Sequence, residues 1–468
     1  MSRPVADTRA VRQVRDALGA LVDWHDARPR ARWGSLRGLV WTALIAATFV
    51  WMSNPLVFVP SFYLSLGMAI VWTKVAVIVT LPWLRLPRVP WPWLLFLLLA
   101  WASQWWTISE PNTHLSLVVY TELTVLAVMV AANCEPLVVC WGLGLGGVAT
   151  VALSVYAYEQ ELPGASYAAL EGVIFTGIGT NQNILAYTMA VSLAAVLAIG
   201  WPRRAINRTL WLGVLGVDLY GVHLANSSNG YLTALSLLVA AALVALWPRV
   251  RARGRGHTWG VAAGAGALLL LAAVVVVTAL GDQFSTFSGR APLWRAAIES
   301  TMSTAPVLGS GWGAVWEHPW DSAAPNDVAA DIYARAGLVL SHGHNLLVDV
   351  LPELGLVGVA AALLMLVVTI RQAVVSGVGT APHHATGRLV LFTVVALVVF
   401  GITEPMLTVP LGWWALTLVM TSARQRDVAG RGGHRGWPGR RAARHDTSRS
   451  DEGREPGSAE SGSNVMAR

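Results

Sequence analysis

Twelve apolar runs constrain the fold of this chain more than any other feature of its sequence. A helix that spans a bilayer needs about 20 apolar residues, and each run is close to that length. They lie at 36–53, 56–80, 92–109, 115–133, 136–157, 181–200, 208–226, 230–247, 258–280, 349–370, 386–402 and 405–422. Only 13% of the 468 residues are charged, against about 25% in soluble domains. The sequence therefore predicts an all-α membrane protein with about 12 transmembrane helices, and it excludes a soluble enzyme and a disordered chain.

The positions of the basic residues predict the orientation of these helices. With a cytoplasmic N-terminus and twelve alternating spans, 30 of the 33 Lys and Arg residues fall on the inner side. This is the distribution that the positive-inside rule describes. We therefore expect a multi-pass protein of the cytoplasmic membrane with both termini inside. The net charge of +7 then reflects topology and gives no support to nucleic-acid binding.

The two ends of the chain differ from its apolar middle. Residues 1–35 form an Arg-rich segment without the apolar core of a cleavable signal peptide, so we expect a cytoplasmic N-tail. Residues 423–468 are rich in Arg, Gly and Ser and predict a disordered cytoplasmic C-tail. The two cysteines, Cys134 and Cys140, are interpreted as free thiols because two Cys cannot build a disulfide scaffold.

One predicted external loop, 281–348, is far longer than the others and lies between the ninth and tenth spans. Long loops in compact proteins are usually functional. A helix is predicted from Arg290 to about Ser303, and a tight turn rich in Gly and containing Trp follows Pro306. A second short helix is predicted over 326–336. We therefore expect a structured external loop.

His344 is the strongest candidate for chemistry. The loop ends with Ser-His-Gly-His-Asn at 341–345, and a helical apolar pattern begins at Leu346, which places His344 or Asn345 at a helix N-terminus. The helix dipole there keeps a histidine neutral near pH 7, as a general base requires. The other interpretation is that His344 only caps the helix. His342 is the rival base, two residues away.

Several motifs resemble those of a known membrane-protein family. His344-Asn345, followed by Glu353, Gly355 and Gly358, resembles a motif of the O-antigen ligase and O-antigen polymerase proteins. The family's Gly-Arg, Trp, Pro and Gly-x-Gly run is matched upstream by Gly289, Arg290, Trp294, Pro306, Gly309 and Gly311. Its Asn-Pro-Asn element is similar to Asn181-Gln182-Asn183, with Gln182 in the Pro position.

The resemblance implies a GT-C-like glycosyltransferase domain over 36–422. Proteins of this family transfer a glycan from a polyprenyl-pyrophosphate carrier to an acceptor hydroxyl outside the cytoplasmic membrane, with inversion and without a metal. The implied partners are the lipid-linked donor, a glycan, lipid or protein acceptor, and membrane lipid. No cofactor is implied. Ligase and polymerase share donor and base, so the sequence does not separate them.

The donor pyrophosphate needs cationic contacts, and Arg matches phosphate oxygens best. Only Arg290, Arg295 and Arg335 fall on the predicted external face. Arg290 is the match to the family motif. Arg295 could instead pair with Glu299 on the same helix, and Arg335 could pair with Asp331.

Supporting roles are predicted for Asn183, Asn345, His342 and Glu353, the last orienting a polar group in the cavity or pairing with Arg290. Asn181 and Asn183 are expected to hydrogen-bond at the entry of the sixth span, and Asp349 to complement a helix dipole. Asp218 and His223 are interpreted as a buried pair or as part of the lining of a lipid-glycan cavity. His342, His344, His318 and Asp321 make a weak metal pattern, so no metal site is predicted.

The chain departs from the family at Asn229, where the family commonly has an Arg. This departure keeps a non-catalytic partner in envelope polysaccharide export among the alternatives. A transporter or lipid flippase is the other alternative, although transporters often show two matching halves and no internal repeat is visible here.

The predicted orientation can be tested without reference to any activity. A cysteine introduced as Ala324→Cys should react with a membrane-impermeant thiol reagent in intact cells, whereas Gly432→Cys should react only after the membrane is permeabilised. The reverse pattern would place the 281–348 loop in the cytoplasm.

Overall fold

The computed structural model describes residues 29–59, 74, 89–169, 172–252, 290–318, 326–378 and 385–432. Helices occupy ten of the twelve predicted apolar runs; the run at 258–280 and most of 56–80 lie outside these ranges. The ten helices are α2 (Leu36–Met52), α4 (Trp91–Ala102), α5 (Glu110–Asn133), α6 (Pro136–Glu159), α7 (Gln182–Ile199), α8 (Ala205–Ala225), α9 (Ser228–Ala252), α14 (Val350–Val378), α15 (Ala385–Gly401) and α16 (Pro410–Gly432).

The chain is a membrane protein built mostly of helices. In the described ranges, five helices are long and apolar enough to cross a bilayer: α5, α6, α7, α9 and α14. Large apolar side chains remain exposed on the outer helices, as on α8, where Ile206 is 73% and Leu212 51% exposed. Such surfaces are costly in water, but they suit contact with lipid.

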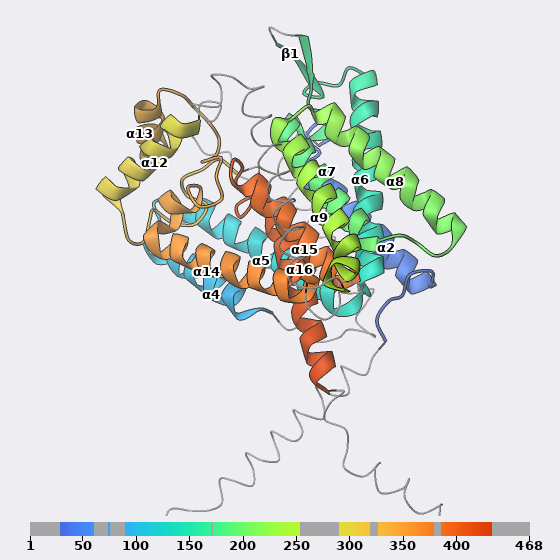
Figure 1. Ribbon diagram of the computed structural model, residues 1–468. Coiled ribbons are helices and arrows are strands. Elements are labelled where there is room, and N and C mark those ends of the chain that lie inside the picture. The colour runs from blue at the N-terminus through green and yellow to red at the C-terminus, as the bar shows by residue number, and fades with distance from the viewer. Residues whose placement is uncertain are drawn as a thin grey trace, which may run out of the picture. The chain divides into compact units, whose positions relative to one another are not determined.

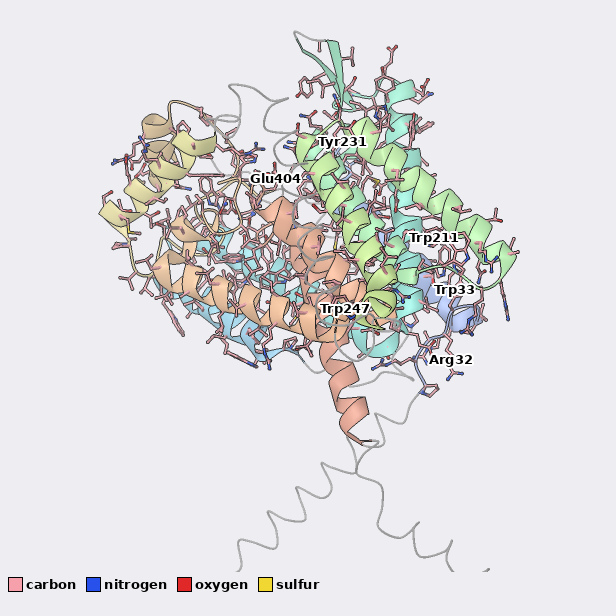
Figure 2. The ribbon with its side chains drawn as sticks, viewed as in Figure 1. Arg32, Trp33, Trp211, Tyr231, Trp247 and Glu404 are labelled. Atoms are coloured by element: carbon pink, nitrogen blue, oxygen red, sulfur yellow. The ribbon has the colours of Figure 1, made fainter. Side chains whose placement is uncertain are left out.

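Helix α7 lies at the centre of one half of the bundle. It packs against α6, α8, α9 and α15, and α6 also packs against α2. Nearly every residue of α7 from Leu185 to Ile199 is buried, as expected for a helix surrounded by others. On the other side of α15, α14 runs beside α4 (Figure 1). Trp33, Trp211 and Trp247 lie toward the opposite end of the bundle from Glu404 (Figure 2).

Two short elements differ from an all-α chain. Strands β1 (Ser166–Ala169) and β2 (Gly172–Phe175) form an antiparallel hairpin with Ser166 opposite Phe175. The hairpin lies in the 158–180 connection between α6 and α7, beyond the apolar runs. The remaining short pieces are two 3-10 turns, η2 (Ser103–Trp105) and η3 (Gly177–Gly179).

The long predicted loop contains two helices, α12 (Arg290–Thr304) and α13 (Asp327–Ala336). The Asn326 side chain caps α13 by accepting from the Ala329 N–H, so this helix confirms the prediction over 326–336. Ile298 of α12 is 44% exposed, whereas Leu293, Ala296 and Ala297 pack against residues of α13. These side chains form a small core separate from that of the bundle. Ser288, Gly289 and Asp321 lie outside the described residues.

Helix α14 begins later than predicted and is broken near its start. It starts at Val350, because residues 345–349 form a turn in which Asn345 Oδ1 accepts from the N–H groups of Leu347 and Val348. The break lies at Gly355 (φ 61°, ψ −162°). Only glycine adopts such a conformation easily.

The 306–311 turn supplies the hydrogen bonds that the break removes from α14. Ser310 N–H donates to the Pro352 carbonyl (2.9 Å) and Gly311 N–H to the Glu353 carbonyl (2.8 Å). In return, Leu356 N–H donates to Pro306 and Val357 N–H to Val307. Buried backbone groups need hydrogen-bond partners inside the protein, so this turn and the broken helix form one unit.

An aromatic cluster fixes the same turn from the other side. The Trp312 ring contacts Phe96 of α4 (centroids 5.3 Å apart) and Tyr120 of α5 (5.1 Å), both edge to face. Trp413 of α16 also contacts both rings. Edge-to-face pairs add stability beyond the burial of apolar area. The turn that carries Gly309 and Gly311 is therefore held by α4, α5 and α14, and α16 packs against the two aromatic rings that contact Trp312.

The fit between this turn and α14 predicts the effect of a methyl group at Gly355. A Cβ there would lie 2.4 Å from the carbonyl carbon and oxygen of Val307. Gly355→Ala should lower the free energy of unfolding by about 2–4 kcal/mol, measured by denaturing-detergent titration. Gly213→Ala is the matched control, because nothing lies within 4 Å of the added carbon on α8. Equal stability of the two variants would contradict the prediction.

Candidate functional site

Glu404 is the centre of the strongest polar cluster in the described structure. Its Oε1 accepts from Arg290 Nη2 (2.8 Å) and from Asn183 Nδ2 (3.0 Å), and its Oε2 lies 3.2 Å from His344 Nδ1. The Glu404 side chain is 6% exposed, His344 13% and Arg290 16%. Ion pairs are stronger at such burial than at a surface, so the four side chains form one unit.

Four separate segments bring these side chains together. Arg290 begins α12, Asn183 lies in the first turn of α7, and His344 belongs to the turn before α14. Glu404 lies in the short connection between α15 and α16. Figure 2 shows it between the α12–α13 segment and the ends of α7 and α9. Sequence motifs that are up to 221 residues apart thus meet at one end of the bundle.

The Glu404 carboxylate determines which nitrogen of His344 can act as a base. A carboxylate only accepts hydrogen bonds, so Nδ1 carries the proton when the ring is neutral, and this tautomer is assigned from the contact. Nε2 then holds the free lone pair. The same division of roles orients the base in Ser-His-Asp triads.

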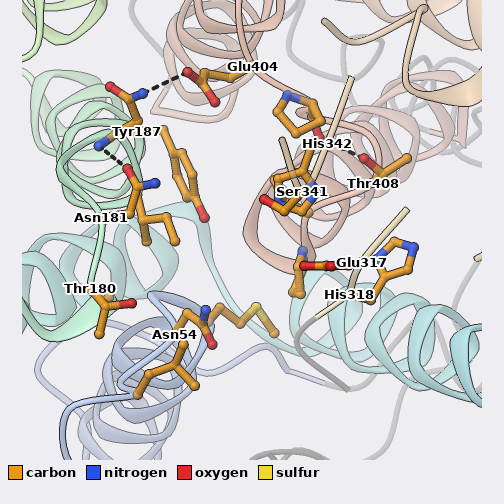
Figure 3. A pocket seen from close by; sticks show the side chains of 18 of the residues that line it. Asn54, Thr180, Asn181, Tyr187, Glu317, His318, Ser341, His342, Glu404 and Thr408 are labelled. Carbon is orange, nitrogen blue, oxygen red and sulfur yellow. Dashed lines mark hydrogen bonds between the residues drawn. The ribbon is translucent and has the colours of Figure 1, made fainter. Parts of the chain in front are cut away.

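His344 and Glu404 line a cavity of about 460 Å³ (Figure 3). One part of its wall is apolar and includes Trp51, Leu56, Val119 and Leu123. The other part carries amides, hydroxyls, imidazoles and two carboxylates; it includes Asn54, Asn181, Glu317, His318, Ser341 and His342. The cavity therefore has both a surface for an apolar chain and groups that bond hydroxyls.

Backbone strain is concentrated at this cavity. Five non-glycine residues of the described chain have positive φ, and three of them line the cavity: Asn54 (60°), Thr180 (56°) and His344 (46°). A left-handed conformation is unusual for a β-branched residue such as Thr180. Strain of this kind gathers at functional sites, and it supports the assignment of the cavity.

Some of the predicted site residues meet at Glu404, and others lie apart from it. His344, Arg290 and Asn183 meet at Glu404, with the His342 ring 6.1 Å from the His344 ring. Arg295 is exposed on α12, and Arg335 pairs with Asp331 on the surface of α13 (2.8 Å), which lowers the pKa of Asp331. Asn345 donates to the Ile402 carbonyl (2.9 Å).

Glu353 does not pair with Arg290, as one of its two predicted interpretations required. It is fully buried on α14, and its Oε1 lies 3.5 Å from His318 Nε2. The carboxylate partner of Arg290 is Glu404, which is not among the site residues predicted from the sequence. Its signal was an acidic residue between the eleventh and twelfth apolar runs.

The other predicted polar residues have ordinary partners. Asn181 caps α7 by accepting from the Asn183 N–H (2.8 Å), as expected. Asn229 donates to Thr403 Oγ1 (2.6 Å), so it holds the connection that carries Glu404. Asp218 accepts from Ser192, while His223 lies 3.2 Å from the Tyr231 hydroxyl. The predicted Asp218–His223 pair is therefore wrong, and neither residue lines the cavity.

Two further chemical properties follow from the described residues. Cys134 and Cys140 are both free and buried. In the described ranges no three His, Cys, Asp or Glu side chains are grouped so that they could hold a metal ion.

Comparison with known proteins gives one informative similarity. The chain is 26% identical over 237 residues to the exopolysaccharide production protein ExoQ of Rhizobium meliloti (strain 1021). The match covers 47% of this chain and 52% of that protein, so it spans about half the length of each. No family model matches the chain.

The environment of His342 predicts a pH dependence of stability. Burial, followed by the neighbouring His344 and His318 rings, lowers the pKa of His342 to about 3, against about 6.5 in an unfolded chain. Between these values the unfolded chain binds a proton that the folded protein does not, so stability falls as the pH drops below about 6.5.

His342→Gln removes the titrating imidazole and with it this pH dependence of stability. Its unfolding temperature should fall less between pH 7 and pH 4.5 than that of the parent protein, as measured by thermal unfolding in detergent. Parallel profiles for the two proteins would show that His342 is not the group responsible.

Proposed function

We propose that this protein is a membrane glycosyltransferase that acts in exopolysaccharide production, as a glycan ligase or polymerase. It transfers a glycan from a polyprenyl-pyrophosphate donor to an acceptor hydroxyl at the external face of the membrane. The proposal rests chiefly on the His344–Glu404 contact in the wall of a cavity at one end of the bundle. The similarity to an exopolysaccharide production protein supports it.

His344 is the proposed general base. The acceptor hydroxyl gives its proton to His344 Nε2 while its oxygen forms a bond to the anomeric carbon of the donor. The bond between that carbon and the pyrophosphate oxygen breaks, and the electron pair leaves with the carrier pyrophosphate. Glu404 stabilises the imidazolium that forms, as a carboxylate does in a triad. Attack opposite the leaving group inverts the anomeric centre.

Arg290 is the proposed contact for the donor pyrophosphate. It reaches the cavity wall through Glu404, to which it donates at 2.8 Å. A pyrophosphate carries at least two negative charges and can share this guanidinium with the carboxylate. Arg295, exposed on the same helix, is a second proposed contact. Arg335 would first have to leave Asp331, so its contribution is expected to be the smallest of the three.

The cavity wall also suits the rest of a lipid-linked donor. Its apolar part, near Trp51 and Leu123, offers a surface for the first isoprene units. Polar residues of the wall, among them Asn54 and Glu317, offer hydrogen-bonding groups for sugar hydroxyls. Asn345 and Glu353 keep supporting roles, the first by its hydrogen bond to Ile402 on the connection that carries Glu404 and the second beside His318 of the cavity wall.

Transfer by purified protein with a polyprenyl-pyrophosphate-linked glycan tests the proposal. His344→Ala should lower turnover about 100-fold or more, with donor binding retained.

Glu404→Gln should lower the turnover as well. Since Arg290 and Asn183 both donate to Oε1, the amide oxygen takes that place and the amide N–H faces His344 Nδ1, which forces the wrong tautomer. Arg290→Lys should cost about 2–4 kcal/mol of transition-state stabilisation.

His342→Ala is the matched control, two residues from the base, and should retain most of the turnover. Normal turnover in folded His344→Ala protein would exclude the mechanism. Movement of the lipid across vesicle membranes without glycan transfer would instead indicate a flippase.

A further inference from the structure

The segment that carries His344 is clamped on both sides of this residue. Trp294 Nε1 of α12 donates to the Gly343 carbonyl (2.9 Å), and the Gly343 N–H donates to Asp349 Oδ1 (2.6 Å). On the other side, the Asn345 amide donates to the Ile402 carbonyl (2.9 Å). With both neighbours fixed, His344 is held at φ 46°, a conformation that few non-glycine residues adopt.

Asp349 connects this clamp to the segment that carries Glu404. Its Oδ1 accepts from Gly343, and its Oδ2 accepts from the Thr408 hydroxyl, four residues beyond Glu404. The Thr408 carbonyl in turn accepts from the Tyr120 hydroxyl of α5. Asp349 is fully buried. A buried carboxyl without partners would be costly, so its two hydrogen bonds hold both segments to it.

We propose that Asp349 is a positioning residue that holds His344 within reach of Glu404. It touches neither the cavity nor a reacting atom. It joins the 341–345 segment to the 404–410 segment through its two hydrogen bonds. It thereby determines the distance between His344 and Glu404. The expected effect of Asp349 on turnover rests on the proposed function. The link between the two segments does not.

The link does not require a charge on Asp349. Burial, and then the nearby Glu353, raises the pKa of Asp349 to about 7. An ionised carboxyl accepts from both partners. A protonated one still accepts from Gly343 and donates to Thr408 Oγ1, whose hydroxyl can turn to the Pro405 carbonyl 3.2 Å away. Asparagine offers the same acceptor and donor, so Asp349→Asn should keep the link, whereas Asp349→Ala should break it.

A spin-label measurement tests the link without any assay of transfer. Labels are attached to Ser341→Cys, which is exposed on the clamped segment, and to Ile206→Cys, which is exposed on α8. The background carries Cys134→Ala and Cys140→Ala, which remove the two native cysteines. Since α8 alone is 21 residues long, the labels are on the order of 30 Å apart, a range suited to pulsed electron resonance in lipid nanodiscs.

We expect a narrow distance distribution in the parent protein and in Asp349→Asn, and a broad or shifted one in Asp349→Ala. Thr408→Val breaks the same link from the other segment and should act like Asp349→Ala, which keeps the test decisive if the alanine variant does not fold. Thr369→Val is the matched control, because that buried hydroxyl bonds only to Met365 in its own helix. A parental distribution in folded Asp349→Ala and Thr408→Val would overturn the proposal.

Turnover in the same variants separates this inference from the proposed function. If both hold, Asp349→Ala loses at least about 10-fold in turnover with donor binding unchanged, and Asp349→Asn is close to parental. If the distribution broadens in Asp349→Ala but the parent protein transfers no glycan, the positioning role stands and the proposed function fails. Broadening with parental turnover would show that Asp349 orders the segment but does not position the base.

Discussion

The break in α14 at Gly355 is the constraint on which the loop end of the molecule depends. A helix buried among apolar neighbours cannot leave backbone carbonyl and N–H groups unpaired. The 306–311 turn meets this need with four backbone hydrogen bonds between residues 306–311 and 352–357. That pairing fixes the end of α12, whose Trp294 in turn reaches Gly343. The position of the candidate base therefore follows from a requirement of the backbone.

Glu404 plays the corresponding part among the side chains. One carboxylate takes hydrogen bonds or close contacts from a guanidinium, an amide and an imidazole that come from three other segments. Each donor alone would be a polar group close to an apolar bundle, and a carboxylate without donors would be costly to bury. The cluster is stable only when its members are all present.

The sequence predicted the helices better than the site. Apolar runs specify where helices lie, because burial and backbone pairing leave few alternatives, and ten of them coincide with observed helices. The motif residues Arg290, Asn183 and His344 meet in space as a common site requires. Glu404 was missed because a single acidic residue in a short connection has no periodicity or spacing to mark it. The break at Gly355 could not be predicted from the sequence, because its cause, the 306–311 turn, is a contact distant in sequence. The cytoplasmic tails, the twelve-span count and the orientation remain predictions.

The Arg290–Glu404 pair has a consequence for selectivity. The guanidinium is neutralised at 2.8 Å by a carboxylate that is itself only 6% exposed. A singly charged ion such as chloride or acetate would only exchange one anion for another and would lose its hydration in doing so. A ligand gains from this arginine only if it brings more negative charge than the carboxylate, or if the rest of its structure is bound elsewhere in the cavity. The Arg290–Glu404 ion pair thus disfavours the binding of small, singly charged anions at this site.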